Sequence, residues 1–104
     1  MFAYVRTIQL QRDKLDEAVQ IWREGALPLL KAAPGFKEFL WMCDPESGNT
    51  QTVALWESEA AFEAALANPA LDEHFAKFPN LRAAEGVSAT YEVRLHERDS
   101  PDRP

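Results

Sequence analysis

Residues 35–56, GFKEFLWMCDPESGNTQTVALW, decide the fold. Two runs rich in Phe, Leu, Trp, Met and Val flank a cluster of Asp, Pro, Ser, Gly and Asn, which is typical of a chain reversal between strands. Because strand side chains alternate between the two faces, one face of the first strand is expected to carry Phe36, Glu38, Leu40 and Met42, and the other Lys37, Phe39, Trp41 and Cys43. Both faces are largely apolar, and a two-layer domain covers only one. The hairpin therefore predicts a partner for the second face, such as another copy of the chain.

The segments around the hairpin predict an α+β order. Residues 1–10 read as a strand, and an apolar stripe from Leu15 to Ala26 predicts a helix whose end Gly25 and Pro28 kink or loosen. A second helical segment follows Trp56, with Ser58 as a cap and a restart at Asn68-Pro69.

Residues 87–95 alternate and predict the last strand. The order β-α-β-β-α-β is that of the ferredoxin-like fold, an antiparallel sheet with two helices on one face. We expect a single domain over residues 1–96 and a disordered tail over 97–104, which is charged and Pro-rich.

Composition excludes several classes of function. The chain has 104 residues and a formal net charge of −6, without a Lys/Arg cluster, which argues against nucleic-acid and anionic-membrane partners. The single cysteine, Cys43, cannot form an intrachain disulfide and is expected to be buried. The longest apolar run, 39–43, is far shorter than a membrane span, and no signal peptide is apparent, so we expect a cytoplasmic protein.

Familiar cofactor and metal motifs are absent from the sequence. It contains no glycine-rich nucleotide fingerprint, no P-loop and no G-x-S-x-G, and neither His74 nor His96 has a second ligand at metal-binding spacing. We therefore expect neither a metal nor a cofactor.

A few side chains are candidates for chemistry. Histidine titrates near physiological pH, so His74 is either a general base or a histidine at the core boundary. Arg6 either binds an anionic oxygen or forms an ion pair with Glu38 or Glu92. Five aromatic residues either line a flat pocket or fill the core: Tyr4, Trp22, Trp41, Trp56 and Tyr91.

Three short motifs carry a family resemblance. Pro34-Gly35-Phe36 enters the second strand, ALWESEAAF at 54–62 places a Trp before an acidic helix start, and Asn68-Pro69 interrupts that helix. Over about residues 1–95 the chain resembles the antibiotic biosynthesis monooxygenase family of dimeric α/β-barrel proteins. The resemblance implies a homodimer and a pocket between the sheet and the helices of each subunit.

The family implies an activity as well. Characterised members include cofactor-independent oxygenases of quinols and anthrone-like phenolics. Polyketide-oxygenating members share the Trp at 56, but this chain has Thr52 where they place an Asn, Phe62 where they place a Tyr, and His74 and Phe75 near their Arg. We therefore hypothesise a cofactor-independent monooxygenase of a small aromatic quinol or phenol. His74 would be the base, Arg6 or Tyr4 would steady the oxyanion, and the substrate would contact Trp22, Thr52, Trp56, Phe62 and Phe75.

Two alternatives remain open. The replacement of polar pocket residues by Thr52 and Phe62 would suit a dimeric ligand-binding or stress-related barrel protein without turnover. Related barrels bind and degrade haem with an Asn on the first strand and a His late on the second helix. Here the first strand carries Arg6 and Thr7, and His74 falls about one residue from the matching position, so this is the least favoured of the three.

Overall fold

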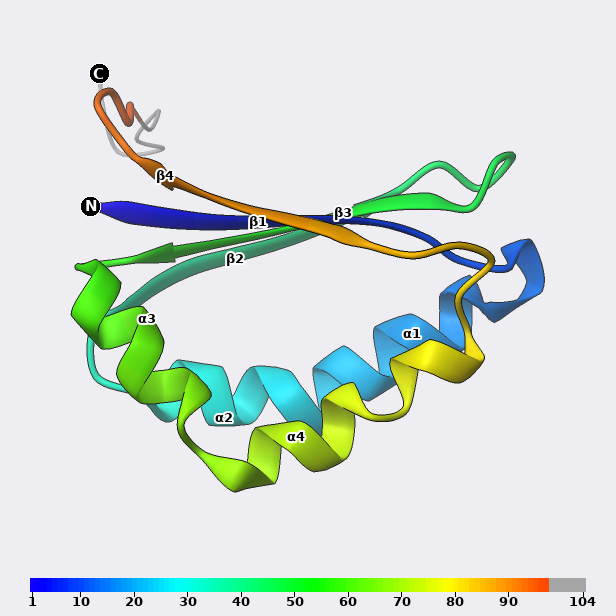
Figure 1. Ribbon diagram of the computed structural model, residues 1–104, viewed down its shortest axis with the longest axis horizontal. Helices are drawn as coiled ribbons and strands as arrows, with labels where there is room; N and C mark the ends of the chain where they lie inside the picture. Colours follow the sequence, from blue (N-terminus) through cyan, green and yellow to red (C-terminus); the bar gives the residue numbers. More distant parts are fainter. Residues whose placement is uncertain (98–104) are drawn as a thin grey trace, which may run out of the picture.

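Four strands form one antiparallel sheet in the computed structural model, which describes residues 1–97. The strands are β1 (Phe2–Gln9), β2 (Phe36–Cys43), β3 (Asn49–Trp56) and β4 (Val87–Glu92), in the spatial order β2-β3-β1-β4. All of the helices lie on one face of the sheet (Figure 1). The predicted ferredoxin-like α+β fold is thereby confirmed, with the sheet of the single chain open rather than closed into a barrel. Apart from Glu97, the tail predicted at 97–104 lies outside the described residues.

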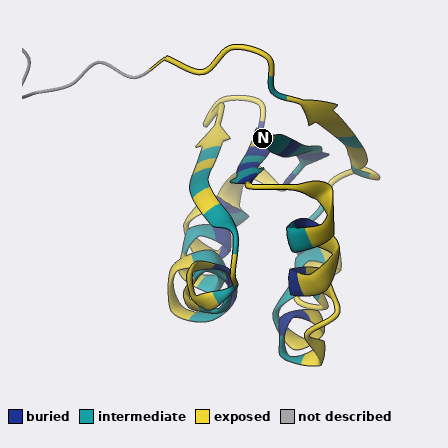
Figure 2. Ribbon diagram, turned by 90° about the vertical axis from the view of Figure 1, so that its left-hand side faces the viewer, coloured by how far each residue is buried: buried dark blue, intermediate teal, exposed yellow. Residues whose placement is uncertain are grey.

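The helical layer consists of two segments. The first comprises the 3₁₀ turn η1 (Arg12–Lys14), α1 (Leu15–Ile21), the π-helix η2 (Trp22–Ala26) and α2 (Leu27–Ala32). The second comprises α3 (Glu59–Leu66), α4 (Pro69–Phe75) and the 3₁₀ turn η3 (Phe78–Asn80). Seen end-on, the two segments stand side by side beneath the sheet, and much of their outer surface is exposed (Figure 2).

Local sequence signals place the breaks in these helices. The Ser58 hydroxyl accepts a hydrogen bond from the Ala61 amide at 3.1 Å, and the Asn68 side chain accepts one from the Ala70 amide at 3.0 Å, so the caps predicted at these two residues are confirmed. The sequence also offers Asp13 as a cap for the first helix, but no side chain of the described residues caps that helix. The loosening predicted near Pro28 is the π-helix, in which the Leu27 amide donates to the Trp22 carbonyl. Proline cannot donate to the helical ladder and its ring crowds the carbonyl four residues earlier, so the widened turn lies immediately before it.

A β-bulge changes the predicted faces of the hairpin. Phe36 pairs with Trp56, but Glu38 pairs with Leu55, so Lys37 is the extra residue. Phe36 consequently lies on the helix side, where its ring meets that of Trp56 edge-on at a centroid distance of 5.4 Å. The prediction that Phe36 shares a face with Leu40 was wrong, because strict alternation fails at a bulge.

The hairpin turn is held by its own polar groups. Asp44 accepts hydrogen bonds from the Ser47 hydroxyl at 2.9 Å and from the Glu46 amide at 3.1 Å. These bonds, the Ser47 side chain first, hold the pKa of Asp44 below its usual value, because they stabilise the carboxylate. Gly48 adopts φ = 81°, a conformation that suits glycine.

The C-terminal part of the described chain departs from the predicted strand. β4 ends at Glu92 rather than Leu95, and Arg94 pairs with Glu92 at 3.3 Å. His96 lies 3.2 Å from Glu38, on the opposite edge strand, so this segment returns across the sheet face that the helices leave uncovered. Cys43 is exposed, contrary to expectation, since it lies at the end of the edge strand β2.

Candidate active site

A cavity of about 280 Å³ lies between the sheet and the helices. β1 provides its central residues, β2 and β3 add one residue each, and the helical segments provide the opposite wall. The lining residues are Tyr4, Arg6, Ile8, Leu10, Trp22, Trp41, Thr52, Leu66, Phe75, Phe78, Pro79 and Arg82.

The cavity lies where two separate hydrophobic clusters meet. One cluster surrounds Trp56, and Tyr4, Trp22 and Phe75 pack against it. The other surrounds Leu10, and Trp41 and Phe78 pack against it. Residues of both clusters line the cavity, so the cavity is the space that remains between the two clusters, under the same face of the sheet.

Trp22 organises the aromatic wall of the cavity. Its ring contacts Phe39, Phe75 and Phe78 at centroid distances of 4.9, 5.7 and 5.4 Å. Trp22 is the first residue of the π-helix, and such widened turns occur frequently at functional sites. These tilted and edge-on contacts make the wall aromatic, as suits an aromatic ligand.

A polar row crosses the floor of the cavity. In the sheet register Arg6 lies between Ser88 on one side and Thr52 on the other, with Trp41 next to Thr52. Arg6 Nη1 donates to Ser88 Oγ at 2.7 Å, and the same oxygen lies 3.0 Å from Tyr4 Oη. Ser88 therefore holds both a guanidinium and a phenol at the polar end of the cavity.

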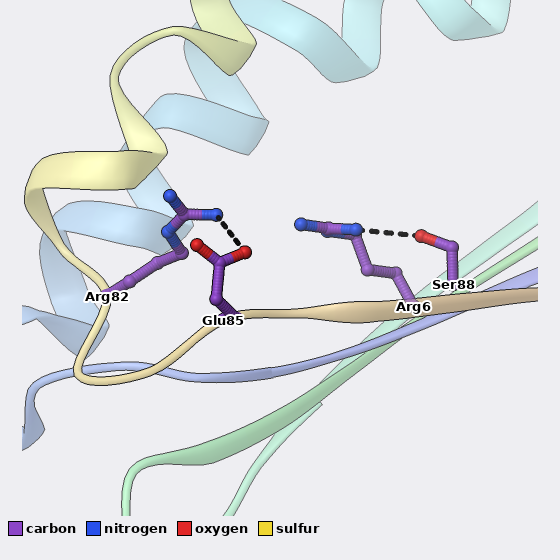
Figure 3. A network of polar contacts seen from close by, with 4 residues as sticks. All are labelled: Arg6, Arg82, Glu85 and Ser88. Atoms are coloured by element: carbon purple, nitrogen blue, oxygen red, sulfur yellow. Dashed lines mark hydrogen bonds and ion pairs between the residues drawn. The ribbon is translucent and has the colours of Figure 1, made fainter.

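A second arginine reaches this polar end from the loop before β4. Arg82 Nη1 lies 3.9 Å from Glu85 Oε2, and a Cβ on the next residue, Gly86, would lie only 2.6 Å from Arg6 Nη2. Both guanidinium groups therefore adjoin the short segment Glu85–Gly86. Figure 3 shows the Glu85 carboxylate between the two arginine side chains in that view.

The lining offers hydrogen-bond donors but no strong base. It contains two guanidinium groups and two hydroxyls, without a histidine or a carboxylate. Such a site can stabilise an anionic oxygen on an aromatic ring through charge-assisted hydrogen bonds. Among residues 1–97, no group of three or more His, Cys, Asp and Glu side chains is placed to hold a metal ion.

Five of the eight predicted site residues lie together in this cavity. They are Tyr4, Arg6, Trp22, Thr52 and Phe75. Arg6 hydrogen-bonds Ser88 rather than pairing with Glu38 or Glu92. Thr52 is 4% exposed, on the buried side of β3.

The structure places His74 away from the cavity. Its imidazole packs against the backbone of Gly25, so closely that a Cβ there would overlap the ring. It borders a shallow groove on the outer side of α1, η2 and α4, together with Glu17 and Glu24. This position fits a boundary histidine better than a base acting on a molecule in the cavity.

Trp56 and Phe62 lie beside the site rather than in it. Trp56 is 1% exposed and meets Phe62 edge-on at a centroid distance of 6.0 Å. Phe62 stacks on Tyr4 at 5.0 Å, so Phe62 supports the Tyr4 ring from the core side, and Trp56 in turn supports Phe62.

Sequence reasoning missed several lining residues, above all Arg82. Arg82 lies in the connection between η3 and β4, where no periodic pattern indicates direction. Phe78, in contrast, belongs to the predicted helical stripe. For Trp41 the sequence did not decide between a pocket residue and a core residue. The sequence contains both arginines, but they lie 76 positions apart. No sequence pattern indicates that Arg6 and Arg82 border the same cavity.

Comparison with known proteins connects this arrangement to one family. The family model described as antibiotic biosynthesis monooxygenase matches residues 1–78. No curated protein matches the chain. In the part of the chain that the structure describes, no helix is long and apolar enough to cross a membrane.

Solved structures agree in fold at low sequence identity. The ActVA-Orf6 monooxygenase of Streptomyces coelicolor, solved with Nanaomycin D, is 19% identical with a TM-score of 0.80, covering 95% of this chain and 92% of its own. SnoaB, a cofactor-independent oxygenase from Streptomyces nogalater, is 16% identical with a TM-score of 0.78, covering 94% and 97%. Rv0793 from Mycobacterium tuberculosis is 13% identical with a TM-score of 0.74, covering 94% and 98%. Because the family model covers most of the sequence, the chain belongs to the antibiotic biosynthesis monooxygenase family.

Proposed function

We propose that the protein is a cofactor-independent monooxygenase that oxidises a small aromatic quinol or phenol in the cavity. The observation that carries the proposal is the Arg6–Ser88–Tyr4 network facing an aromatic wall. Family membership supports the same reaction class.

Arg6 and Tyr4 act on the substrate oxygen in this proposal. A cation and a hydroxyl donor lower the pKa of a nearby phenol, because both stabilise the phenolate. Since the lining holds no histidine or carboxylate, the phenol loses its proton to water rather than to a side chain. Ser88 positions both groups, and Trp22 and Phe75 hold the ring.

The substrate itself supplies the electrons. The phenolate passes one electron to dioxygen, and the two radicals combine to form a hydroperoxide at a ring carbon. Loss of water then leaves a carbonyl at that carbon, so one oxygen atom enters the product and the other leaves as water. Enclosure by the aromatic wall shields these intermediates from side reactions.

Oxygen uptake with a panel of one- and two-ring quinols tests the proposal. We expect uptake by the wild type, a loss of about tenfold or more in kcat/KM for Arg6→Gln, and little change for Arg23→Gln, which removes the same charge from the outer surface. His74→Ala should keep the wild-type rate. Absence of uptake with every quinol, or an Arg6→Gln variant as active as the wild type, would refute the assignment.

A binding protein without turnover is the second candidate. The observation that favours it is the lack of an acid–base side chain in the lining. Such a protein should retain the quinols, and their binding should raise its melting temperature, while no oxygen is consumed. Ligand-dependent oxygen uptake would exclude this alternative.

We also propose that the active form is a homodimer paired through the sheet face opposite the helices, beside the C-terminal segment that crosses this face to Glu38. An apolar row crosses this face in register, formed by Leu40, Val53, Val5 and Ala89. Leu40 is 54% exposed and Tyr91, on the same face, 56%. Val5, Val53 and Ala89 are half-buried. Apolar surface gathered on one face in this way is typical of an interface, and the family resemblance implies the same assembly.

Light scattering on the purified protein tests the assembly. We expect twice the chain mass for the wild type and a monomer for Leu40→Glu, since a charge at the centre of the row opposes burial. Ala60→Glu, which adds the same charge on the exposed side of α3, should stay dimeric. A wild type that is monomeric at all concentrations would rule out the dimer.

A further inference from the structure

The polar end of the cavity is a local positive region on an acidic protein. The chain as a whole carries a formal charge of −6, yet the lining contains two arginines and no acidic residue. Long-range electrostatics therefore disfavour an anionic ligand, while the immediate surroundings favour one. Arg6 and Tyr4 already account for the hydroxyl of a neutral quinol, which leaves the second arginine, Arg82, without an assigned role.

Much of the hydrogen-bonding capacity of the two guanidinium groups is not used by the described residues. Among residues 1–97, Arg6 donates to Ser88 alone, and a guanidinium has five N–H donors. Arg82 has one partner, Glu85, at 3.9 Å, which is beyond hydrogen-bond distance. The Glu85 side chain is 90% exposed and that of Arg82 is 26% exposed, and exposed ion pairs of this type contribute little.

Glu85 therefore forms only a weak ion pair with Arg82. Its carboxylate lies beside a guanidinium that also borders the cavity. A carboxylated ligand in the cavity would make the same contact and compete with Glu85 for it. Exchanging one carboxylate for another costs little, because the charge on Arg82 stays paired and the Glu85 side chain returns to water.

We propose that the substrate is a hydroxylated aromatic carboxylate, with its carboxylate bound by Arg82 in place of Glu85. Its hydroxyl lies at Arg6 and Tyr4, so this inference rests on the proposed function. The size of the cavity limits the ligand: at about 280 Å³ it lies just below the range of about 300–1,000 Å³ for ligand pockets. One or two fused rings are suitable occupants.

Calorimetric titration with three matched probes tests the proposal. The probes are 1-hydroxy-2-naphthoate, its neutral amide 1-hydroxy-2-naphthamide, and 1-naphthol. We expect the carboxylate to bind about tenfold more tightly than either neutral probe, as is usual for a hydrogen-bonded charge pair. Equal affinities for the three probes would overturn the proposal.

Charge-matched variants identify the residue responsible. Arg82→Gln should abolish most of the carboxylate preference, whereas Arg23→Gln should retain it. Glu85→Gln should tighten carboxylate binding several-fold by removing the competing group, whereas Glu63→Gln, on the exposed side of α3, should not. If Arg82→Gln fails to fold, as circular dichroism would show, Glu85→Gln decides alone, and an unchanged affinity refutes the exchange.

The experiments can refute the carboxylate-binding proposal and the monooxygenase proposal independently of each other. Binding preference is measured without turnover, so it can hold in a protein that consumes no oxygen. Conversely, oxygen uptake with neutral quinols can proceed in a protein that shows no carboxylate preference.

Discussion

Replacing Gly86 by alanine should disturb the site without removing any charged or polar group. The added Cβ would lie 2.6 Å from Arg6 Nη2 and 2.9 Å from Arg6 Cζ, whereas ordinary contacts begin at 3.4 Å. The guanidinium must therefore move by about 0.8 Å. The backbone needs no change, because the glycines with positive φ among the described residues are Gly35 and Gly48.

The displacement is large enough to affect binding. Arg6 Nη1 lies 2.7 Å from Ser88 Oγ, and a shift of this size takes the pair to the limit of a hydrogen bond. The displaced guanidinium would also make a longer hydrogen bond to a bound phenolate. Such charge-assisted bonds contribute about 1.5–3 kcal/mol, so partial loss corresponds to roughly a tenfold lower affinity. Stability should change little, because the gain of about 0.4–1 kcal/mol from restricting the unfolded chain is offset by the weakened Arg6–Ser88 hydrogen bond.

Titration of bound 4-nitrophenol measures the effect directly, because the phenolate is coloured and the phenol is not. The wild type should lower the pKa of the bound phenol, and Gly86→Ala should lower it by about one unit less. In an Arg6→Gln background, Gly86→Ala should have no further effect. A full effect in that background would show that Gly86 acts otherwise than through Arg6, and unchanged titration by the single variant would refute the reasoning.

Three further predictions concern the scaffold. Gly25→Ala should lower the unfolding free energy by about 1–3 kcal/mol through overlap with His74, and His74→Ala should relieve this loss; chemical denaturation of both single variants and the double variant checks it. Ser47→Ala should raise the pKa of Asp44, measured by NMR titration, because the wild-type hydroxyl stabilises the carboxylate. The contribution of this lowered pKa to stability is present above about pH 4 and lost as the pH falls through the pKa in the folded state. The difference in stability between Ser47→Ala and the wild type should therefore shrink as the pH falls through that pKa. Asn68→Ala should cost about 1 kcal/mol in thermal unfolding by removing the helix cap, and a loss no greater than that of an exposed control would count against the cap.

Most of the fold could be predicted because its signals are local. Alternation identifies the strands, and the caps at Ser58 and Asn68 depend on residues within three positions along the chain. The bulge at Lys37 could not be predicted in this way, since it depends on how β2 aligns with β3 across the hairpin. The face of Phe36 was consequently assigned wrongly, although the hairpin itself was correct.

The candidate site was predictable only where one element carries several of its residues. Tyr4 and Arg6 lie two apart on β1, so the strand period places both side chains toward the helices. His74 adjoins Phe75, but one step along a helix turns the side chain by about 100°, which is enough to direct it to Gly25 instead of the cavity. Arg82 reaches the site from a loop whose course no periodicity describes.

The polar row in the sheet is an independent indication that the cavity is a functional site. Stability alone would favour apolar residues at the centre of a sheet face that packs against helices, because burying polar groups carries a desolvation cost. Thr52 and Arg6 lie at that centre, between the two hydrophobic clusters. Positions where a chain departs from the pattern that best stabilises its fold are where functional sites are expected. Thr50, in the next row, is also buried, but its hydroxyl is satisfied by the Ile8 carbonyl at 2.9 Å. The row that contains the Arg6–Ser88 hydrogen bond is the one that forms the floor of the cavity.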